Sequence, residues 1–466
     1  GTSRNWTAIT ADASGNIWAA AYGVDVFKRT AGAGAFTATT LGAKAFSGLV
    51  YNNTNGYLYC SVHENNIYRA NGTTSYSDGD KVQIRATHET YESLQNANQG
   101  KAPATETTWW LSLGKTNRWK CFDEQISVQT TQAESMTYVF APGEVEAIAF
   151  MNLESSTVDI IEIDNDDNLI VNGLDWTGAT GTTQPTSWDK VGTPADYKIH
   201  TSAIQGLCCR ITTDAANEGM SQTITVSAAT EYQLVFAYAN STGDVAQVGV
   251  YDATHSADIL TTTDLPDTAN SWSVYSYVFT TPAGCTSVKI SLLGKSSGDI
   301  VYFDYVKCAP TKYSETITTG ALIKYACKTD LWKDANCILT VNINNTGSTA
   351  KIGEMVMGTK YDIGGRSPNY GASWGGQDWS TIEQGTFGYE IVERDKSKWM
   401  RLTIDVPEAS WDYVSNLIQG YMSSYLMWLG SETNQCLMIY GFPDEWSFTA
   451  NEPSYAVLDL SIKGIP

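Results

Sequence analysis

Short runs in which apolar and polar residues alternate occupy much of the stretch between Asn168 and Cys308. The clearest runs are Tyr232–Tyr238, Ala246–Val250 and Val288–Leu292. Period-two patterning sends one set of side chains into a core and the other toward solvent, as in a half-buried β-strand. Turn-forming segments such as residues 240–244 and 266–270 separate the runs. The stretch is therefore predicted to fold as a β-sandwich of two packed antiparallel sheets.

The order of short motifs within this stretch is similar to that of the jelly-roll carbohydrate-binding modules appended to plant-cell-wall hydrolases. The motifs are Asn168–Gly173, then Trp188, Gly206–Ile211, Ser221–Val226, Tyr232–Phe236, Trp272–Pro282 and Val301–Val306. The resemblance covers the whole stretch. It implies a jelly-roll fold more firmly than it implies a ligand, because such sandwiches carry many functions.

Sugar binding requires flat aromatic rings beside amides or acids, because sugars present apolar C–H faces and hydroxyl groups. The candidate glycan-binding residues in the stretch are Trp188, Tyr238, Gln247, Tyr251 and Trp272. Half of them are expected only to pack the sandwich, and the direction in which each side chain points decides. The resemblance also implies a structural calcium, for which Asp304 could supply one oxygen ligand. A buried carboxylate that caps backbone groups is an equal alternative for Asp304.

An internal repeat marks the N-terminal residues 1–73. The segment Trp6–Lys28 reappears as Phe46–Arg69 at an offset of 40 to 41 residues. A four-stranded propeller blade has this period. Two blades cannot close a ring, so the remaining blades are expected either upstream of Gly1 or in other subunits. Three copies would complete a six-bladed ring, and the sequence therefore favours a homotrimer.

Residues 74–114 contain Tyr76, Asp80, Tyr91 and the pair Trp109–Trp110 in an order that resembles small chitin-binding-like modules of bacterial and phage proteins. New β patterns follow at residues 115–167 and resume at residues 309–365. We interpret these two segments as halves of one host sandwich, into which residues 168–308 are inserted at an exposed loop tip.

A second resemblance involves the two halves of the host sandwich and the C-terminal residues 366–466. The segments that carry it are Arg118–Asp123, Gly353–Gly358, Val392–Arg394, Tyr425–Gly430, Leu437–Phe442 and Leu458–Gly464. In this order they resemble a widespread group of tailed-bacteriophage virion proteins described as tail or structural proteins. Residues 366–466 are predicted to be β-rich, with one helix over Trp411–Tyr421 because its apolar residues share one helical face.

Composition excludes several classes of protein. The net charge of −21, from 50 acidic and 29 basic residues, opposes binding to nucleic acid and to anionic membranes. No apolar run is long enough to span a bilayer.

The nine cysteines lack the spacing of a zinc site, and we expect them to be reduced. Cys285 and Cys308 are the first pair to test for a bridge. No catalytic motif is present, so the chain is not expected to be an enzyme.

The sequence thus predicts an all-β, multidomain chain of β-sandwich and jelly-roll modules with propeller-blade-like repeats at the N-terminus. The predicted function is that of a bacteriophage tail-associated virion protein, a tail fibre or tail-tip component on the particle exterior. Its partners would be other virion proteins and host cell-surface polysaccharide. Two alternatives remain open: a purely structural or decorating virion protein, and, less favoured, a polysaccharide depolymerase.

Overall fold

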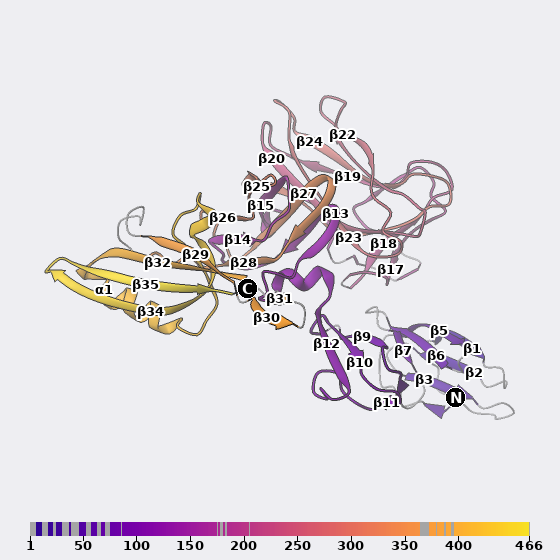
Figure 1. Ribbon diagram of the computed structural model, residues 1–466. Coiled ribbons are helices and arrows are strands. Elements are labelled where there is room, and N and C mark those ends of the chain that lie inside the picture. Colours follow the sequence, from indigo (N-terminus) through magenta and orange to yellow (C-terminus); the bar gives the residue numbers. More distant parts are fainter. Residues whose placement is uncertain are drawn as a thin grey trace.

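Antiparallel sheets dominate the computed structural model of the 466-residue chain, so the predicted all-β class is confirmed (Figure 1). The structure describes residues 75–465 except 85, 175, 178–179, 182–183, 205, 364–371, 379, 386–387 and 393–395. Within 381–392, at residue 451, and in the strands before residue 75, only the backbone is described. No helix in this described part is both long and apolar enough to cross a membrane.

Two antiparallel sheets form the N-terminal part, at the lower right of Figure 1. The first has the order β1-β2-β3-β4, built from Trp6–Ala11, Ile17–Ala21, Asp25–Arg29 and Thr37–Ala38. The second has the order β5-β6-β7, built from Phe46–Asn52, Tyr57–Val62 and Ile67–Arg69. The aromatic side chains of the repeat lie outside the described residues, and the blade assignment stays a prediction.

A small module follows, with strands β8–β12 at Ser75–Tyr76, Lys81–Ile84, Glu89–Ser93, Asn98–Gln99 and Trp110–Lys115. Its core contains Trp110, which is 2% exposed and meets the Tyr76 ring edge-on at 5.0 Å between centroids. The Trp110 indole N–H donates to Lys101 O at 3.1 Å. Trp109 is only partly buried. One tryptophan of the pair therefore cements the module.

The host sandwich draws strands from both sides of the insert. One sheet contains β13 (Thr130–Phe140), β27 (Cys337–Ile352), β15 (Thr157–Asp164) and the end of β25 (Ile300–Thr318). The other has the order β26-β14-β28, from Tyr325–Lys328, Ala147–Met151 and Glu354–Gly358. Short 3-10 helices at Asn117–Phe122 and Asn165–Asp167 flank β13 and β15. Alternate residues such as Val158, Ile160 and Val341 fill the core between the sheets.

The insert is a sandwich of two five-strand layers. One layer has the order β16-β19-β24-β21-β22, from Asp189–Val191, Glu218–Thr225, Ser287–Gly294, Ala246–Asp252 and Ala257–Asp264. The other comprises β17 (Asp196–His200), β18 (Cys208–Thr212), β25, β20 (Glu231–Asn240) and β23 (Ser273–Thr280). Strand β25 pairs with β18 and β20 before Thr311 and with β15 from Thr311 onward. The two domains therefore share one continuous strand.

The Asn168–Gly173 motif anchors the entry to the insert. The Asn168 side-chain oxygen accepts from Ile170 N at 3.2 Å and Cys308 N at 2.9 Å, which ties the two ends of the insert together. Position 173 requires glycine, because a Cβ there would lie 2.6 Å from Val306 O. A backbone hydrogen bond of 2.8 Å joins the same two residues, from Val306 N to Gly173 O.

Buried thiols line the sandwich cores. Of the nine cysteines, all eight with described side chains are free, and seven are buried. Cys285 and Cys308 are both in the insert core and form no bridge. They pack as small apolar side chains.

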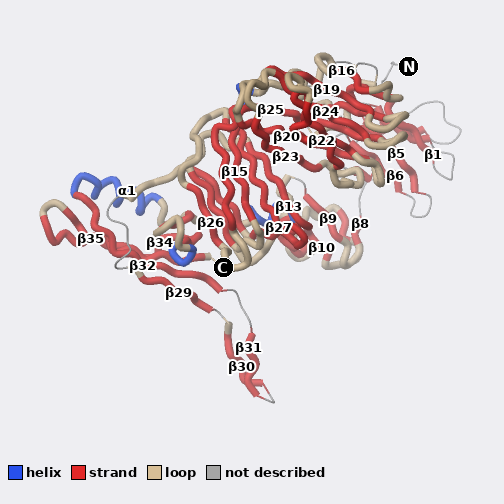
Figure 2. The backbone as a smooth tube through the Cα atoms, turned by 90° about the horizontal axis from the view of Figure 1, so that it is seen from above, coloured by secondary structure: helices blue, strands red, loops and turns tan. Residues whose placement is uncertain are grey.

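The C-terminal domain extends to the left of Figure 1 as a sheet of order β29-β32-β35-β34-β33. Its strands are Ser373–Asp378, Lys396–Pro407, Tyr455–Gly464, Met438–Glu452 and Leu426–Leu429. The predicted helix is confirmed as α1, Trp411–Gly420, which buries Val414 and Ile418 against the sheet. Two 3-10 turns, Glu408–Ser410 and Gln435–Leu437, precede α1 and β34. A hairpin of β30 (Thr381–Gly385) and β31 (Gly388–Val392) projects away from this sheet (Figure 2).

Candidate functional site

The outer face of the insert layer that contains β25 has two different surroundings. At one end Val235 and Val274 pack on Ile163 and Ile338 of the host sandwich. Two residues before Val274, Trp272 is partly exposed, as are Tyr302 and Arg210 on neighbouring strands. The uncovered end of this sheet face therefore begins next to the residues that contact the host.

A row of aligned residues crosses that uncovered end. Cross-strand pairing places Lys198, Arg210, Tyr302 and Ala239 side by side on neighbouring strands, in that order. Trp272, the residue just before β23, follows Ala239 in this register. Residues that alternate with them, including Ile211 and Phe303, belong to the insert core. Because successive side chains in a strand point to opposite faces, the row points away from the core.

Three partly exposed rings gather on this face. The Trp272 and Tyr302 rings meet edge-on at 6.4 Å between centroids, across the small side chain of Ala239. His200 lies on the other side of Tyr302, with centroids 5.7 Å apart. The Trp272 indole N–H donates to Ser202 O at 3.1 Å, which fixes the ring against the β17–β18 loop. These contacts restrict the orientation of the three rings.

A fixed group of charges adjoins the rings. Asp196 pairs with Lys198, at 3.0 Å between Nζ and Oδ1, and with the Arg210 guanidinium. Burial opposes the charged form of Asp196, but hydrogen bonds from Arg210 and Lys198 outweigh it and lower the pKa of the carboxyl. Burial also raises the pKa of the Tyr302 hydroxyl, which stays protonated and able to donate. We call Asp196, Lys198, His200, Arg210, Trp272 and Tyr302 the outer-face cluster.

Two of the predicted glycan-binding residues lie in the core instead. Trp188 is 6% exposed, donates from its indole to Asn172 O at 3.0 Å and packs on Trp176. Tyr238 is 2% exposed, and its hydroxyl donates to Pro266 O at 3.3 Å. Both rings stabilise the sandwich and present no open face to a ligand.

The other layer holds two further candidates, on its own outer face. Gln247 is buried and donates to Asp264 Oδ1 at 2.7 Å. Tyr251 is partly exposed, with the Lys289 ammonium 5.0 Å from its ring centroid. The structure therefore distributes the five predicted residues over the core and two opposite faces, and only Trp272 belongs to the outer-face cluster.

Asp304 is a capping carboxylate. Its Oδ1 accepts from the Trp176 indole at 3.2 Å and from Tyr305 N at 2.8 Å, and its Oδ2 accepts from Ile204 N at 3.1 Å. N–H donors repel a cation, whereas calcium requires six to eight oxygen ligands. Groups of His, Cys, Asp and Glu able to hold a metal are also absent from the described residues. The surroundings of Asp304 do not fit the calcium that the resemblance implies.

Sequence reasoning missed most of the outer-face cluster, although a signal was present. Tyr302 stands between the core residues Val301 and Phe303, and Lys198 stands between Tyr197 and Ile199. Alternation alone therefore predicts that both point outward. It does not predict that they lie in one row, because cross-strand register depends on the whole fold.

Comparison with known proteins gives partial likenesses of fold. No protein family and no curated protein matches the chain. Among solved structures, the enzymatically active domain of bacteriophage CBA120 tailspike protein 4 is 18% identical over 31% of this chain, with a TM-score of 0.25. The match spans only 22% of that tailspike chain.

Two isolated carbohydrate-binding modules are matched over nearly their whole length. The CBM22-1 xylan-binding domain from Paenibacillus barcinonensis Xyn10C is 11% identical, over 33% of this chain and 94% of its own, with a TM-score of 0.24. A family 16 carbohydrate-binding module is 20% identical, over 30% of this chain and 99% of its own, also with a TM-score of 0.24. Each is a distant similarity confined to about a third of this chain.

Proposed function

We propose that this chain is a bacteriophage tail-associated virion protein that binds host-surface polysaccharide through the outer-face cluster of its insert. In this proposal it acts on the particle exterior, as a homo-oligomer, beside other virion proteins. The assignment to a tail is supported by the sequence resemblance of residues 115–167, 309–365 and 366–466 to phage structural proteins. The insert supplies the contact with the host.

The observation that carries the glycan-binding proposal is the position of Trp272 and Tyr302 beside a fixed carboxylate–guanidinium pair. Partly exposed rings offer apolar surface to the C–H faces of a sugar. Arg210 and Lys198 offer donors to its hydroxyl groups, and their ion pairs with the buried Asp196 hold them in place before a ligand arrives. This combination of groups suits an extended saccharide lying across the strands.

A structural role is the second candidate, and it too has a specific observation in its favour. Trp188 and Tyr238 face inward, as expected for an insert that serves only as a spacer. The partly exposed Trp272 and Tyr302 count against that reading, because a spacer gains nothing from aromatic rings at its surface.

The test compares Trp272→Ala with Tyr251→Ala in the full chain, by affinity electrophoresis in gels containing host-surface polysaccharides. Both residues are partly exposed aromatics of the same insert, and they lie on opposite outer faces. Trp272→Ala should weaken binding at least about tenfold, the loss expected for one aromatic anchor. Tyr251→Ala should leave it unchanged. Equal retention by both variants, or no binding by the wild-type chain, would favour the structural role.

The depolymerase alternative is tested separately. We propose that the chain does not hydrolyse the polysaccharide it binds, since no motif or spacing typical of a hydrolase is present in the sequence. Incubation of the purified chain with the same polysaccharides should release no reducing sugar. Release above a boiled-protein control would overturn this part of the proposal.

A further inference from the structure

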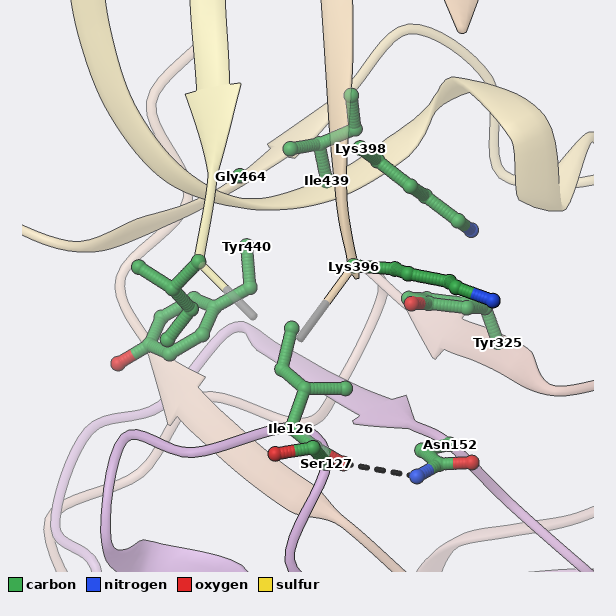
Figure 3. A pocket seen from close by; sticks show the side chains of 10 residues that line it. Ile126, Ser127, Asn152, Tyr325, Lys396, Lys398, Ile439, Tyr440 and Gly464 are labelled. Atoms are coloured by element: carbon green, nitrogen blue, oxygen red, sulfur yellow. Dashed lines mark hydrogen bonds between the residues drawn. The ribbon is translucent and has the colours of Figure 1, made fainter. Parts of the chain in front are cut away.

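A cavity of about 360 Å³ lies where the host sandwich meets the C-terminal domain (Figure 3). The host contributes Ile126, Ser127, Asn152 and Tyr325, and the C-terminal domain contributes Lys396, Lys398 and Tyr440 among others. A cluster of buried residues, including Met151, Met438 and Ile465, packs the two domains together beside it. The walls are therefore fixed by a packed interface, and the volume is at the lower end of that of ligand sites.

Lys398 is the unusual residue of this cavity. Its ammonium lies 3.1 Å from the centroid of the Tyr325 ring and donates to Gln435 O at 3.3 Å. Among the described residues no carboxylate lies within ion-pair distance of it. Burial lowers the pKa of Lys398 to about 8, so the ammonium is still mostly charged at neutral pH. A partly buried cation held by one carbonyl and one ring keeps donor capacity for an anion.

The rest of the cavity suits a small polar ligand. Lys396 stands two residues before Lys398 on β32, on the same face of the strand. It is largely exposed and reaches Asp378 at 3.5 Å, which places its ammonium at the rim. The Ser127 hydroxyl and the Asn152 amide lie on the opposite side, where the amide donates to Ile126 O at 2.8 Å (Figure 3). One partly buried cation, a second at the rim and a few polar groups would orient a ligand with one acidic group and several hydroxyls.

We propose that this cavity binds a small oxyanion-bearing ligand, about the size of one acidic sugar residue, whose carboxylate or phosphate pairs with Lys398. Both acidic groups offer oxygen acceptors to an ammonium, so the pocket chemistry is the same for either source. The site is separate from the outer-face cluster and does not depend on glycan binding by the insert. The chain carries a net charge of −21, so cations gathered in one cavity would concentrate an anion that the rest of the surface repels.

The test is calorimetric titration of the full chain with sodium glucuronate, inorganic phosphate and, as the neutral counterpart, glucose. Glucuronate, phosphate or both should bind, and glucose should not. Binding by glucuronate alone identifies a carboxylate site, and binding by phosphate alone identifies a phosphate site. Both outcomes support the proposal. No binding by either anion, or equal binding by glucose, overturns it.

The matched variants are Lys398→Met and Lys333→Met. Both remove one positive charge, but Lys333 is a surface lysine paired with Glu146 outside the cavity. Lys398→Met should weaken anion binding at least tenfold, and Lys333→Met should not. Equal binding by all three proteins overturns the proposal. Should Lys398→Met fail to fold, the wild-type chain still decides, because its affinity for glucuronate, or for the phosphate dianion, must fall as the pH rises through about 8, where the Lys398 ammonium is lost. A flat affinity from pH 7 to 9 contradicts the assignment.

Discussion

Replacing Asp304 by alanine should loosen the insert by removing the acceptor on which three N–H groups depend. The carboxylate is 1% exposed and accepts from the Trp176 indole and from the backbone of Tyr305 and Ile204. The Trp176 ring is itself only 1% exposed. Water cannot readily replace the lost acceptor for a group so deeply buried, so the indole N–H would be left without a partner.

The size of the effect follows from these contacts. A hydrogen bond to a charged acceptor contributes about 1.5–3 kcal/mol, and an unsatisfied buried donor costs about 1–3 kcal/mol. Three such bonds that share one acceptor are not additive, so we expect a loss of about 3–5 kcal/mol in the free energy of unfolding of the insert. Trp176→Phe removes the indole donor together with part of a buried ring, and should cost about 2–3 kcal/mol. The double variant should cost less than the sum, because each change removes the same hydrogen bond.

The assay is hydrogen exchange followed by mass spectrometry, because a chain of several domains does not unfold in one two-state step. Amides of Tyr305 and Ile204 should lose protection in Asp304→Ala, while amides of the C-terminal sheet should not change. Addition of EDTA to the wild-type chain should change neither, since the groups around Asp304 are donors. A loss below about 1 kcal/mol would refute the reasoning from hydrogen bonds. Loss of protection on adding EDTA, absent in Asp304→Ala, would instead establish a calcium ligand.

Three further outcomes are expected. Deleting residues 166–309 and joining Asn165 to Pro310 should leave a soluble host sandwich with a lower melting temperature, because Ile163 and Ile338 lose the insert residues that cover them; an unfolded remainder would contradict the insertion. Burial raises the pKa of Glu354 from 4.5 to about 8, so its contribution is present below about pH 4.5 and lost as the pH rises through 8. Stability of the host sandwich should fall by on the order of 5 kcal/mol across that window, measured by hydrogen exchange of the sheet that contains β28, and Glu354→Gln should abolish the slope. Light scattering should give the mass of a trimer, and a stable monomer would contradict the predicted assembly through the N-terminal repeats.

Local patterns were sufficient to predict many of the individual elements. The alternating run Tyr232–Tyr238 lies within β20, and the run Val288–Leu292 lies within β24. The helical face that begins at Trp411 corresponds to α1. These predictions succeed because the periods of strands and helices are properties of a few consecutive residues.

Predicting the site required information that no local pattern contains. In β20 both faces of the strand carry apolar residues, so alternation does not tell which face meets the insert core. Tyr238 is therefore a ligand candidate by sequence although it packs inward. The cavity could not be predicted from local patterns either, because residues far apart in the sequence line it. Ile126 and Tyr440 line it together although more than 300 residues separate them in the sequence. Neither residue stands in a motif that indicates the other.

The continuous strand β25 determines how a bound ligand could act on the rest of the molecule. Tyr302 of the outer-face cluster and Tyr313 of the host sandwich lie on this one strand. Its insert half is hydrogen-bonded to β18 and β20, and its host half is hydrogen-bonded to β15. Val235 and Ala309 pack on Ile163 at the junction, which opposes bending there. An insert on a flexible linker would reorient freely, whereas this one keeps the outer-face cluster in a fixed direction relative to the host sandwich. Force or orientation imposed by a polysaccharide at Trp272 would therefore pass into the host sandwich through a hydrogen-bonded sheet.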